Sequence, residues 1–496
     1  MRAFSIKLHR ILALLGGLAI LIWGLSGLLH PIMVTWGPQQ AVFFPPSTPL
    51  DLSEARPFGE VFEEAGLQEA RAVKVIASDG RSLLQVTAAP MEPRRYFDLL
   101  TGGEIEGQDR TQAEFLARYY TQASEPLRSV EFITEFTDNY PSVNRLLPVY
   151  RVAFERQDDL AIYVYTETNA SAGVSNRFKD IVQTGFRWFH SWSWFPREAD
   201  WARTVLILML VGSAFAMTLS GIAMLVLIRR KARAPGIRGW HRIAGYGLAV
   251  PALFFTSSGL FHLLQYSVDP PVPALRLSEP LDLTSGTYDL TADWKAVSEG
   301  MPIGSVSIIE DQAGRVLYRL GLQASRSGGP VTPKEIRNAR FDGVEVTGPA
   351  VYLDAATGEV LDEGDRGLAL ELAGRFTGAG PEAVEGMKLV TRFGAAYDFR
   401  NKRLPVWQVD YGAPVHATVF VDTTTGVLAD QTLDRQKAER LSFSMLHKWN
   451  FLHPLGRDGQ NLATALGALS LVVAIGGLGL VLDLQRRKRR KAGQVQ

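Results

Sequence analysis

Apolar residues along this chain are concentrated in four long blocks. Each block is almost free of charged side chains and reaches the roughly 20 residues that a helix needs to cross a bilayer core. The blocks cover residues 11–29, 202–228, 243–264 and 462–484. The pattern therefore predicts a membrane protein with four transmembrane α-helices. We interpret the first block as a retained anchor, because its apolar run is longer than the core of a typical signal peptide.

The two long segments between these blocks alternate apolar and polar residues at shorter periods. Runs of β-branched and aromatic residues followed by Asp, Thr and Gly predict hairpin strands at residues 161–168, 350–361 and 416–428. Helical periodicity is expected near residues 110–125 and 382–395. The external segments are therefore predicted to be α+β.

Basic residues accumulate at one end of every span, which predicts its orientation. They precede the first span, fill the short connection 229–242 and follow the fourth span as RRKRRK, residues 486–491. The positive-inside rule places these clusters in the cytoplasm. The expected order is a first span with its N-terminus (1–30), an external domain (31–201), a span (202–228), a cytoplasmic loop (229–242), a span (243–264), an external domain (265–461), a span (462–484) and a basic tail (485–496).

Composition narrows the setting and the chemistry. We expect a bacterial inner membrane, with both large segments in the periplasm and both termini in the cytoplasm. The net charge is +1, so the basic ends are explained by topology; the lipid bilayer is an expected partner and nucleic acid is not. The chain has no cysteine, which excludes disulfides, iron–sulfur clusters and covalently attached haem.

The chain also repeats itself. Ser26-Gly27-Leu28-Leu29-His30 matches Ser258-Gly259-Leu260-Phe261-His262 at an offset of 232 residues. Later segments match at an offset of 257, among them LPVYRV with LPVWQV (147–152 and 404–409) and His190-Ser191-Trp192 with His447-Lys448-Trp449. We interpret this as a tandem duplication in which each copy contains a span, an external domain and a second span.

Histidines bracket the first span of each copy. His9 and His30 are 21 residues apart, as are His241 and His262. A helix of that length rises about 31.5 Å, close to the ~30 Å core of a bilayer, so one histidine is expected at each face. His9 and His241 can then meet at the inner face, and His30 and His262 at the outer one. Two neutral imidazoles facing each other can be the axial ligands of a b-type haem, which predicts two haems.

Other residues accompany these pairs. Small residues at Ala13, Gly245, Gly27 and Gly259 are consistent with room for a flat macrocycle. His190 and His447 lie about a dozen residues before their spans in aromatic, interfacial segments. They could replace one or both of His30 and His262 on the outer haem or cover its edge, and the sequence leaves these alternatives open.

The remaining candidates have simpler interpretations. A single histidine at a membrane interface often only caps a helix, but the repetition of the pairs favours ligation. For His416, expected inside a strand, and for His453 a structural or surface role is expected. Four tryptophans are expected to form an aromatic belt, and four carboxylates to form a solvated acidic surface. These residues are Trp188, Trp192, Trp194, Trp201 and Asp354, Glu359, Asp362, Glu363.

The HRxxG-like starts of the first and third spans, their SGLxH ends and the DAATGEVL and DTTTGVL hairpins resemble the PepSY-associated transmembrane helix family. This family includes bacterial inner-membrane ferric-siderophore reductases and iron-regulated membrane proteins, and the likeness covers nearly the whole chain. It implies two PepSY-like periplasmic domains and a two-haem protein that reduces ferric iron in a siderophore or other chelate. The ligands it implies are His9 with His241 and His30 with His262, with His190 and His447 as further candidates. The first span departs slightly, with Ala13 in place of glycine.

A separate electron donor is expected, either a quinol or a cytoplasmic reductase, because the loop 229–242 is too short to hold a flavin or nicotinamide domain. Two other functions fit the same sequence. The external segments could form a membrane-anchored PepSY binding or inhibitory module without redox activity. Alternatively, the chain could transport haem or an iron chelate.

Overall fold

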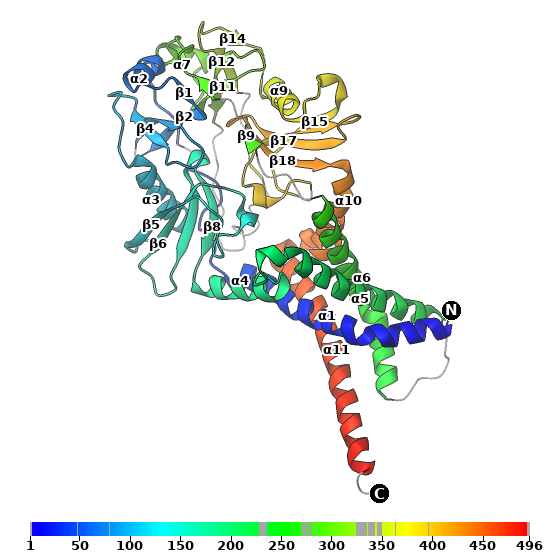
Figure 1. The fold of residues 1–496 in the computed structure, drawn as a ribbon. Helices are drawn as coiled ribbons and strands as arrows, with labels where there is room; N and C mark the ends of the chain where they lie inside the picture. The colour runs from blue at the N-terminus through cyan, green and yellow to red at the C-terminus, as the bar shows by residue number, and fades with distance from the viewer. Residues whose placement is uncertain are drawn as a thin grey trace. The chain divides into compact units, whose positions relative to one another are not determined.

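The chain folds into two compact units, each built from segments that are far apart in the sequence (Figure 1). The computed structural model describes residues 2–493 apart from residues 47, 79, 228–235, 270–274, 277–279, 324–334, 336–342, 345–349, 363 and 395. Residues 1–37, 178–270 and 435–496 form what we call the helical unit. Residues 38–177 and 271–434 form the sheet unit.

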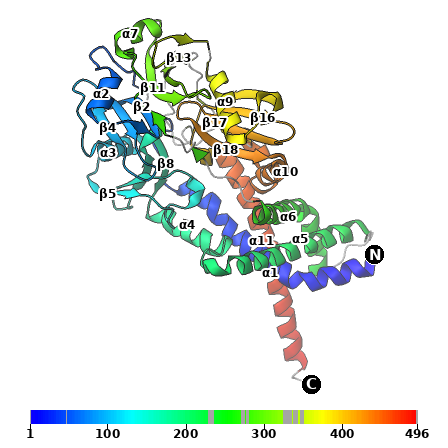
Figure 2. The ribbon, with the colours of Figure 1, turned by 45° about the horizontal axis from the view of Figure 1, so that its top comes forward.

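Four long helices dominate the helical unit: α1 (Arg2–Trp36), α5 (Asp200–Leu227), α6 (Ile237–Val268) and α11 (Gly456–Gly493). Each is long and apolar enough to cross a membrane, so the four long apolar helices predicted from the sequence are confirmed. Helix α1 packs against α5 and α11, and α6 packs against the same two helices, so α1 and α6 face each other across the diagonal of the set. The adjacent course of α1 and α5 is visible in Figures 1 and 2.

Small residues let α1 and α5 approach closely. A Cβ added at Gly16 would lie 3.0 Å from the carbonyl oxygen of Ser213 and 3.1 Å from Cα of Ala214. In a lipid bilayer no hydrophobic driving force brings helices together, so close packing of small residues stabilises their association. Two shorter helices precede the second span of each half: α4 (Arg177–His190) and α10 (Asp434–Ser442). A π-helical turn at Phe443–His447 extends α10.

The sheet unit contains one large antiparallel sheet with the strand order β14-β13-β12-β11-β2-β3-β4. Its strands are β2 (Ala72–Ser78), β3 (Arg81–Thr87), β4 (Arg95–Asp98), β11 (Ile303–Glu310), β12 (Val316–Leu322), β13 (Val351–Asp354) and β14 (Val360–Leu361). Strands β1 (Glu69–Ala70) and β10 (Leu281–Asp282) form a separate pair.

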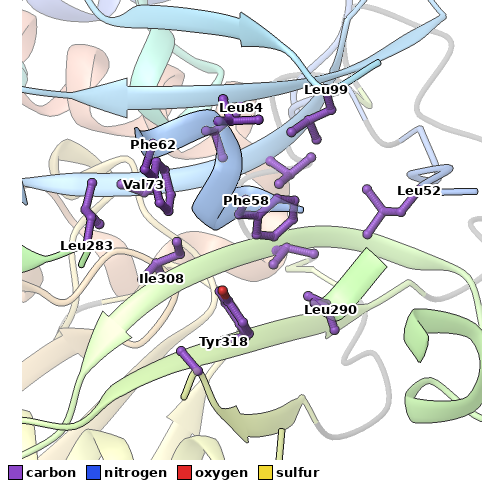
Figure 3. Close-up of a cluster of buried hydrophobic side chains, with 14 of the residues drawn as sticks. Leu52, Phe58, Phe62, Val73, Leu84, Leu99, Leu283, Leu290, Ile308 and Tyr318 are labelled. Carbon is purple, nitrogen blue, oxygen red and sulfur yellow. The ribbon is translucent and has the colours of Figure 1, made fainter. Parts of the chain in front are cut away.

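The large sheet joins the two external segments, for which the sequence suggested one domain each. The junction is the antiparallel pairing of β2 with β11, in which Val306 lies opposite Val75 and Ile308 opposite Val73. Side chains from both segments form one core on this sheet (Figure 3). Helices α2 (Phe58–Glu64) and α7 (Leu290–Val297) contribute to that core, through Phe58 and Leu290 among others.

Two smaller antiparallel sheets complete the sheet unit. One has the order β5-β6-β7-β8, and the other β15-β16-β17-β18-β9. Their strands are β5 (Leu127–Ile133), β6 (Val149–Phe154), β7 (Ala161–Tyr165), β8 (Ala170–Ser175), β9 (Leu275–Arg276), β15 (Val384–Val390), β16 (Val406–Tyr411), β17 (Ala417–Asp422) and β18 (Val427–Leu433). Helices α3 (Gln108–Thr121) and α9 (Asp365–Thr377) each bury one apolar face on these sheets, and Figure 2 shows α9 beside β16 and β17.

A similar polar contact ties each of these helices to the large sheet. Asp109, in the first turn of α3, accepts a hydrogen bond of 2.9 Å from the hydroxyl of Tyr96 on β4. Asp365, in the first turn of α9, accepts one from Tyr352 on β13. A carboxylate in the first turn of a helix also interacts favourably with the helix dipole. The helix, the sheet and the link between them thus occur in the same order in both halves.

The helix predicted near residues 382–395 is wrong, whereas the one near 110–125 is confirmed as α3. Residues 384–390 form strand β15, because Met387 and its neighbours pair in register with β16. Pairing with another strand has overridden the helical periodicity of the local sequence. His416 was expected inside a strand; it lies instead in the turn before β17, with φ of 50°. Residues 229–235 of the predicted loop lie outside the described residues.

Candidate functional site

His9 and His241 meet in the helical unit. Their ring centroids are 6.1 Å apart and the ring planes are inclined by 46°. His9 lies near the start of α1 and His241 near the start of α6, the two helices that face each other across the diagonal. The structure thus brings together the two histidines that the sequence paired for the inner face.

Neighbouring groups on α5 fix the orientation of the His9 ring. Its Nδ1 lies 3.0 Å from the carbonyl oxygen of Met217 and 3.2 Å from Oγ of Ser220. A carbonyl oxygen can only accept, so Nδ1 carries the proton and donates it. In the neutral ring, Nε2 then holds the lone pair that a metal ion requires.

Helix α5 also presses closely on the same ring. A Cβ added at Gly221 would lie 3.2 Å from Cε1 of His9, so glycine at this position leaves room for the imidazole. Gly245, expected to make room beside the inner pair, contacts a different side chain: a Cβ there would lie 3.7 Å from both terminal methyls of Leu225. The close approach to His9 therefore comes from a glycine that sequence reasoning did not select.

At the other end of α1, His190 at the C-terminus of α4 contacts α1 through two hydrogen bonds. Its Nδ1 lies 3.0 Å from Oγ of Ser26, and its carbonyl oxygen accepts a hydrogen bond of 2.9 Å from Nε1 of Trp23. Gly27 lies beside the ring, where an added Cβ would be 3.7 Å from Cε1. Phe186 stacks on the ring with centroids 4.6 Å apart and planes inclined by 15°.

The second half of the chain has the same arrangement around His447. The Nδ1 of His447 lies 3.2 Å from Oγ of Ser258 on α6. A Cβ added at Gly259 would be 3.8 Å from Cε1 of the ring. Phe443 stacks on it with centroids 4.6 Å apart and planes inclined by 12°. A serine, a glycine, a phenylalanine and a histidine therefore lie at nearly the same distances from one another in both halves. In each half they come from separate parts of the sequence.

His30 and His262 lie close to these rings. His30 packs against Phe186 with centroids 5.9 Å apart, and His262 packs against Phe443 at 4.1 Å. The Nδ1 of His262 lies 2.5 Å from Oε1 of the buried carboxylate of Glu439. His190, His262 and His30 all lie within electrostatic range of His447, so four histidines converge near the C-terminal ends of α1 and α6.

Burial keeps His190 and His447 neutral. It lowers the pKa of His190 to about 4. It lowers the pKa of His447 to about 3, with the neighbouring histidines and Lys448 contributing in the same direction. Both rings are therefore uncharged near pH 7, and the neutral imidazole is the form that binds metal.

A tryptophan follows each of these histidines in a backbone conformation that is rare for a bulky residue. Trp192 has φ of 53° and Trp449 has φ of 55°. Trp192 stacks on Trp23 with centroids 5.5 Å apart, and Trp449 stacks on Phe255 at 5.4 Å. Such a conformation persists only where the surroundings enforce it, and here the stacking holds the chain turn that directs each histidine toward its span.

The other predicted residues have more local roles. Of the four tryptophans of the predicted aromatic belt, Trp188, Trp194 and Trp201 are exposed on the helical unit, whereas Trp192 stacks on Trp23. His453 lies in a 3₁₀ turn before α11, and the exposed ring of His416 lies 3.5 Å from Asp434.

The predicted acidic surface forms no metal site in the described structure. Asp354 caps a turn by accepting from the backbone N–H groups of Ala356 and Thr357, while Glu363 lies outside the described residues. Within the described ranges, no three His, Asp or Glu side chains form a group that could hold a bare metal ion. A haem iron needs only two protein ligands, so the paired histidines stay candidates for that group.

Sequence reasoning did not select four residues that shape the site. Ser26 and Ser258 were visible in the repeated SGLxH pattern, but that pattern was used only for its glycine and histidine. Gly221 and Glu439 had no signal in the sequence, because their relation to His9 and His262 depends on how the helices pack.

Comparison with known proteins gives no matching family model and no matching curated protein.

Proposed function

We propose that this chain is a two-haem reductase of the bacterial inner membrane that passes electrons outward to ferric iron held in a siderophore or other chelate. The observation that carries the proposal is the meeting of His9 and His241 across α1 and α6, with ring centroids 6.1 Å apart. Two imidazoles brought together on apolar helices, with His9 half-buried, have few structural reasons to be there, because ionisable groups in a membrane are costly.

The separation fits a shared metal ion. With bonds from imidazole nitrogen to metal of about 2 Å, ring centroids 6.1 Å apart are compatible with two imidazoles that bind one metal ion. The protonated Nδ1 of His9 adds support, because metal-bound histidines usually donate their other N–H to a carbonyl or carboxylate. The residues present therefore fit a haem iron between His9 and His241.

For the outer haem, His190 and His447 are favoured over His30 and His262. Both favoured rings are neutral, donate a hydrogen bond from Nδ1 to a serine oxygen and have a glycine beside Cε1. Glu439, which contacts His262, has no counterpart in the first half, where the residue 257 positions earlier is Val182. The matched pair is the better match for symmetric ligation of one iron.

The topology belongs to the same proposal. The shared order of elements in both halves, together with the repeated sequences, supports a tandem duplication, and the likeness to PepSY-associated proteins supports periplasmic sheet domains. The basic segments 229–242 and 486–491 favour cytoplasmic ends for the spans. Inner and outer histidines would then lie at opposite faces of the membrane.

Haem supplies a centre that accepts and releases one electron at a time. What this chain does is bring imidazoles together at both ends of its spans and pack aromatic side chains against His190 and His447. Transfer of one electron converts chelated Fe(III) to Fe(II), which binds oxygen-rich chelators more weakly, so the metal is released. The electron comes from a separate donor, a quinol or a cytoplasmic reductase.

A reduced-minus-oxidised spectrum of the purified full chain tests the proposal. We expect two b-type haems in the wild type, loss of one in His9→Ala and His241→Ala, and loss of the other in His190→Ala and His447→Ala. His416→Ala is the matched control and retains both, because His416 lies in the sheet unit. A wild-type protein that stays colourless with ample haem supply contradicts the proposal.

Proteoliposomes test the direction of electron transfer. With a reductant sealed inside and an Fe(III) chelate outside, the wild type is expected to produce external Fe(II) while the chelate stays outside, and His9→Ala is not. Uptake of the chelate or of haem without Fe(II) production would favour a transporter. A protein without haem would leave an anchored PepSY binding or inhibitory module.

A further inference from the structure

Each outer histidine is hydrogen-bonded to a serine whose own proton is already used. Ser26 Oγ donates to the carbonyl oxygen of Ile22 at 2.7 Å, and Ser258 Oγ donates to that of Phe254 at 2.5 Å. A hydroxyl has a single proton to donate, so each oxygen can only accept toward the histidine. The Nδ1 atoms, 3.0 Å and 3.2 Å away, must therefore be the donors.

We infer that Ser26 and Ser258 are positioning residues that lock His190 and His447 in the tautomer with the proton on Nδ1 and the lone pair on Nε2. The inference rests on the proposed function in that the metal ion facing Nε2 is haem iron. A neutral imidazole in water favours neither arrangement strongly, so an environment that accepts only at Nδ1 decides which nitrogen can ligate.

A stacked phenylalanine and an adjacent glycine also restrict the orientation of each histidine ring. Phe186 and Phe443 lie nearly parallel to the two rings, at 4.6 Å in both halves, which opposes tilting. Gly27 and Gly259 follow the serines directly and leave space beside Cε1. The serine oxygen and the glycine lie at the Nδ1–Cε1 edge of each ring and the phenylalanine lies against its face, so the contacts that hold the ring leave Nε2 as the nitrogen with the lone pair.

The chain offers a matched control next to Ser258. Ser257 Oγ donates to the carbonyl oxygen of Leu253 at 2.6 Å, as Ser258 does to its own helix. Its substitution by alanine removes an equivalent hydroxyl from α6. Ser258→Ala removes that hydroxyl together with the acceptor for His447, so the difference between the two variants isolates the contact with histidine.

The first measurement reads the tautomer without any haem. In the full chain freed of haem and labelled with ¹⁵N-histidine, we expect His190 and His447 to show a protonated Nδ1 and an unprotonated Nε2, each assigned from its His→Ala variant. Ser26→Ala is expected to give His190 a mixture of tautomers, and Ser258→Ala to do the same for His447. Ser257→Ala and Ser258→Thr, which keep an acceptor at residue 258, are expected to match the wild type.

The second measurement reads the effect on the cofactor. Loss of a hydrogen-bond partner behind a metal ligand typically costs 10- to 100-fold in affinity, so we expect haem transfer to excess apomyoglobin from the outer site to be favoured by about that factor in Ser26→Ala and Ser258→Ala. The inner haem and the Ser257→Ala protein are expected to be unchanged.

The two proposals fail in different ways. Tautomers in Ser26→Ala and Ser258→Ala that equal the wild type overturn the inference, whether or not the protein binds haem. A tautomer lock that is present in a protein unable to bind haem overturns the proposed function and leaves the positioning role of the serines in place. Loss of the outer haem in Ser257→Ala to the same extent as in Ser258→Ala also overturns the inference.

Discussion

Substituting Gly221 by alanine puts a methyl group against the His9 ring. The added Cβ would lie 3.2 Å from Cε1 of His9, below the 3.4–4 Å of an ordinary van der Waals contact, so the ring must yield by a few tenths of an ångström. It cannot do so without lengthening the 3.0 Å contact between Nδ1 and Met217, which belongs to the same helix as Gly221. The substitution therefore displaces the ring of His9.

The size of the effect follows from the tolerance of metal coordination. Bonds to a metal ion hold within about 0.2 Å of their preferred length, so a shift of a few tenths is enough to strain ligation. Overpacking of this kind costs about 1–3 kcal/mol. At 1.4 kcal/mol for each factor of ten, the inner haem is expected to bind about 5- to 150-fold more weakly in Gly221→Ala.

Gly212→Ala is the matched control on the same helix. Among the described residues nothing lies within 4 Å of a Cβ added there, and both substitutions gain up to about 1 kcal/mol of helix propensity. The assay is haem transfer from the purified full chain to excess apomyoglobin, with melting temperature measured in parallel. Equal haem retention in the two variants would refute the close contact between α5 and His9; weaker retention in Gly221→Ala with no fall in melting temperature is the expected result.

Two further predictions concern ion pairs. Arg319 binds Asp365 through two hydrogen bonds, and although burial by itself raises the pKa of Asp365, Arg319 and Tyr352 bring it below its usual range. The ionised Asp365 therefore stabilises the fold above the ordinary carboxyl pKa, and this stabilisation is lost as the pH falls through the lowered pKa. Asp365→Asn is expected to cost about 3 kcal/mol of unfolding free energy at pH 7. It is also expected to reduce the fall in melting temperature between pH 5 and 3. Arg435 also makes two hydrogen bonds, to Asp269, but it is exposed, and Arg435→Gln is expected to lower the melting temperature less than Asp365→Asn does, because solvent screens an exposed ion pair. A larger loss for Arg435→Gln than for Asp365→Asn, in thermal unfolding of the full chain, contradicts the reasoning.

The spans and the inner histidine pair were predictable because they depend on local features that recur. An apolar run of about 20 residues needs no partner to be recognised. The equal spacing of His9 to His30 and of His241 to His262 placed these residues at corresponding positions along α1 and α6. Packing of α1 and α6 on the same two helices then brings His9 and His241 together, as the repeat suggested.

The outer site could not be derived in the same way. His190 reaches α1 only because α4 ends there and Trp192 turns the chain, and neither feature follows from the period of the sequence. The contact of Glu439 with His262 depends on how α10 packs against α6. A carboxylate in a polar helix gives no sign of that packing in the sequence. The failed helix near 382–395 has the same cause, since pairing with a distant strand decided the conformation of those residues.

The two halves are built alike around their outer histidines but present different surfaces. Helix α4 exposes apolar side chains, among them Ile181 and Phe189 at 67% and 61% of their area, as do helices that lie in a membrane interface. Helix α10 instead exposes Arg435 and Lys437 and buries Glu439 against His262. A chelate that is soluble in water would therefore approach the proposed outer ligands along the polar helix α10 rather than along α4, whose exposed side chains are apolar. The proposed duplication would thus keep the metal ligands while the helices in front of them diverged, one toward lipid and one toward the acceptor.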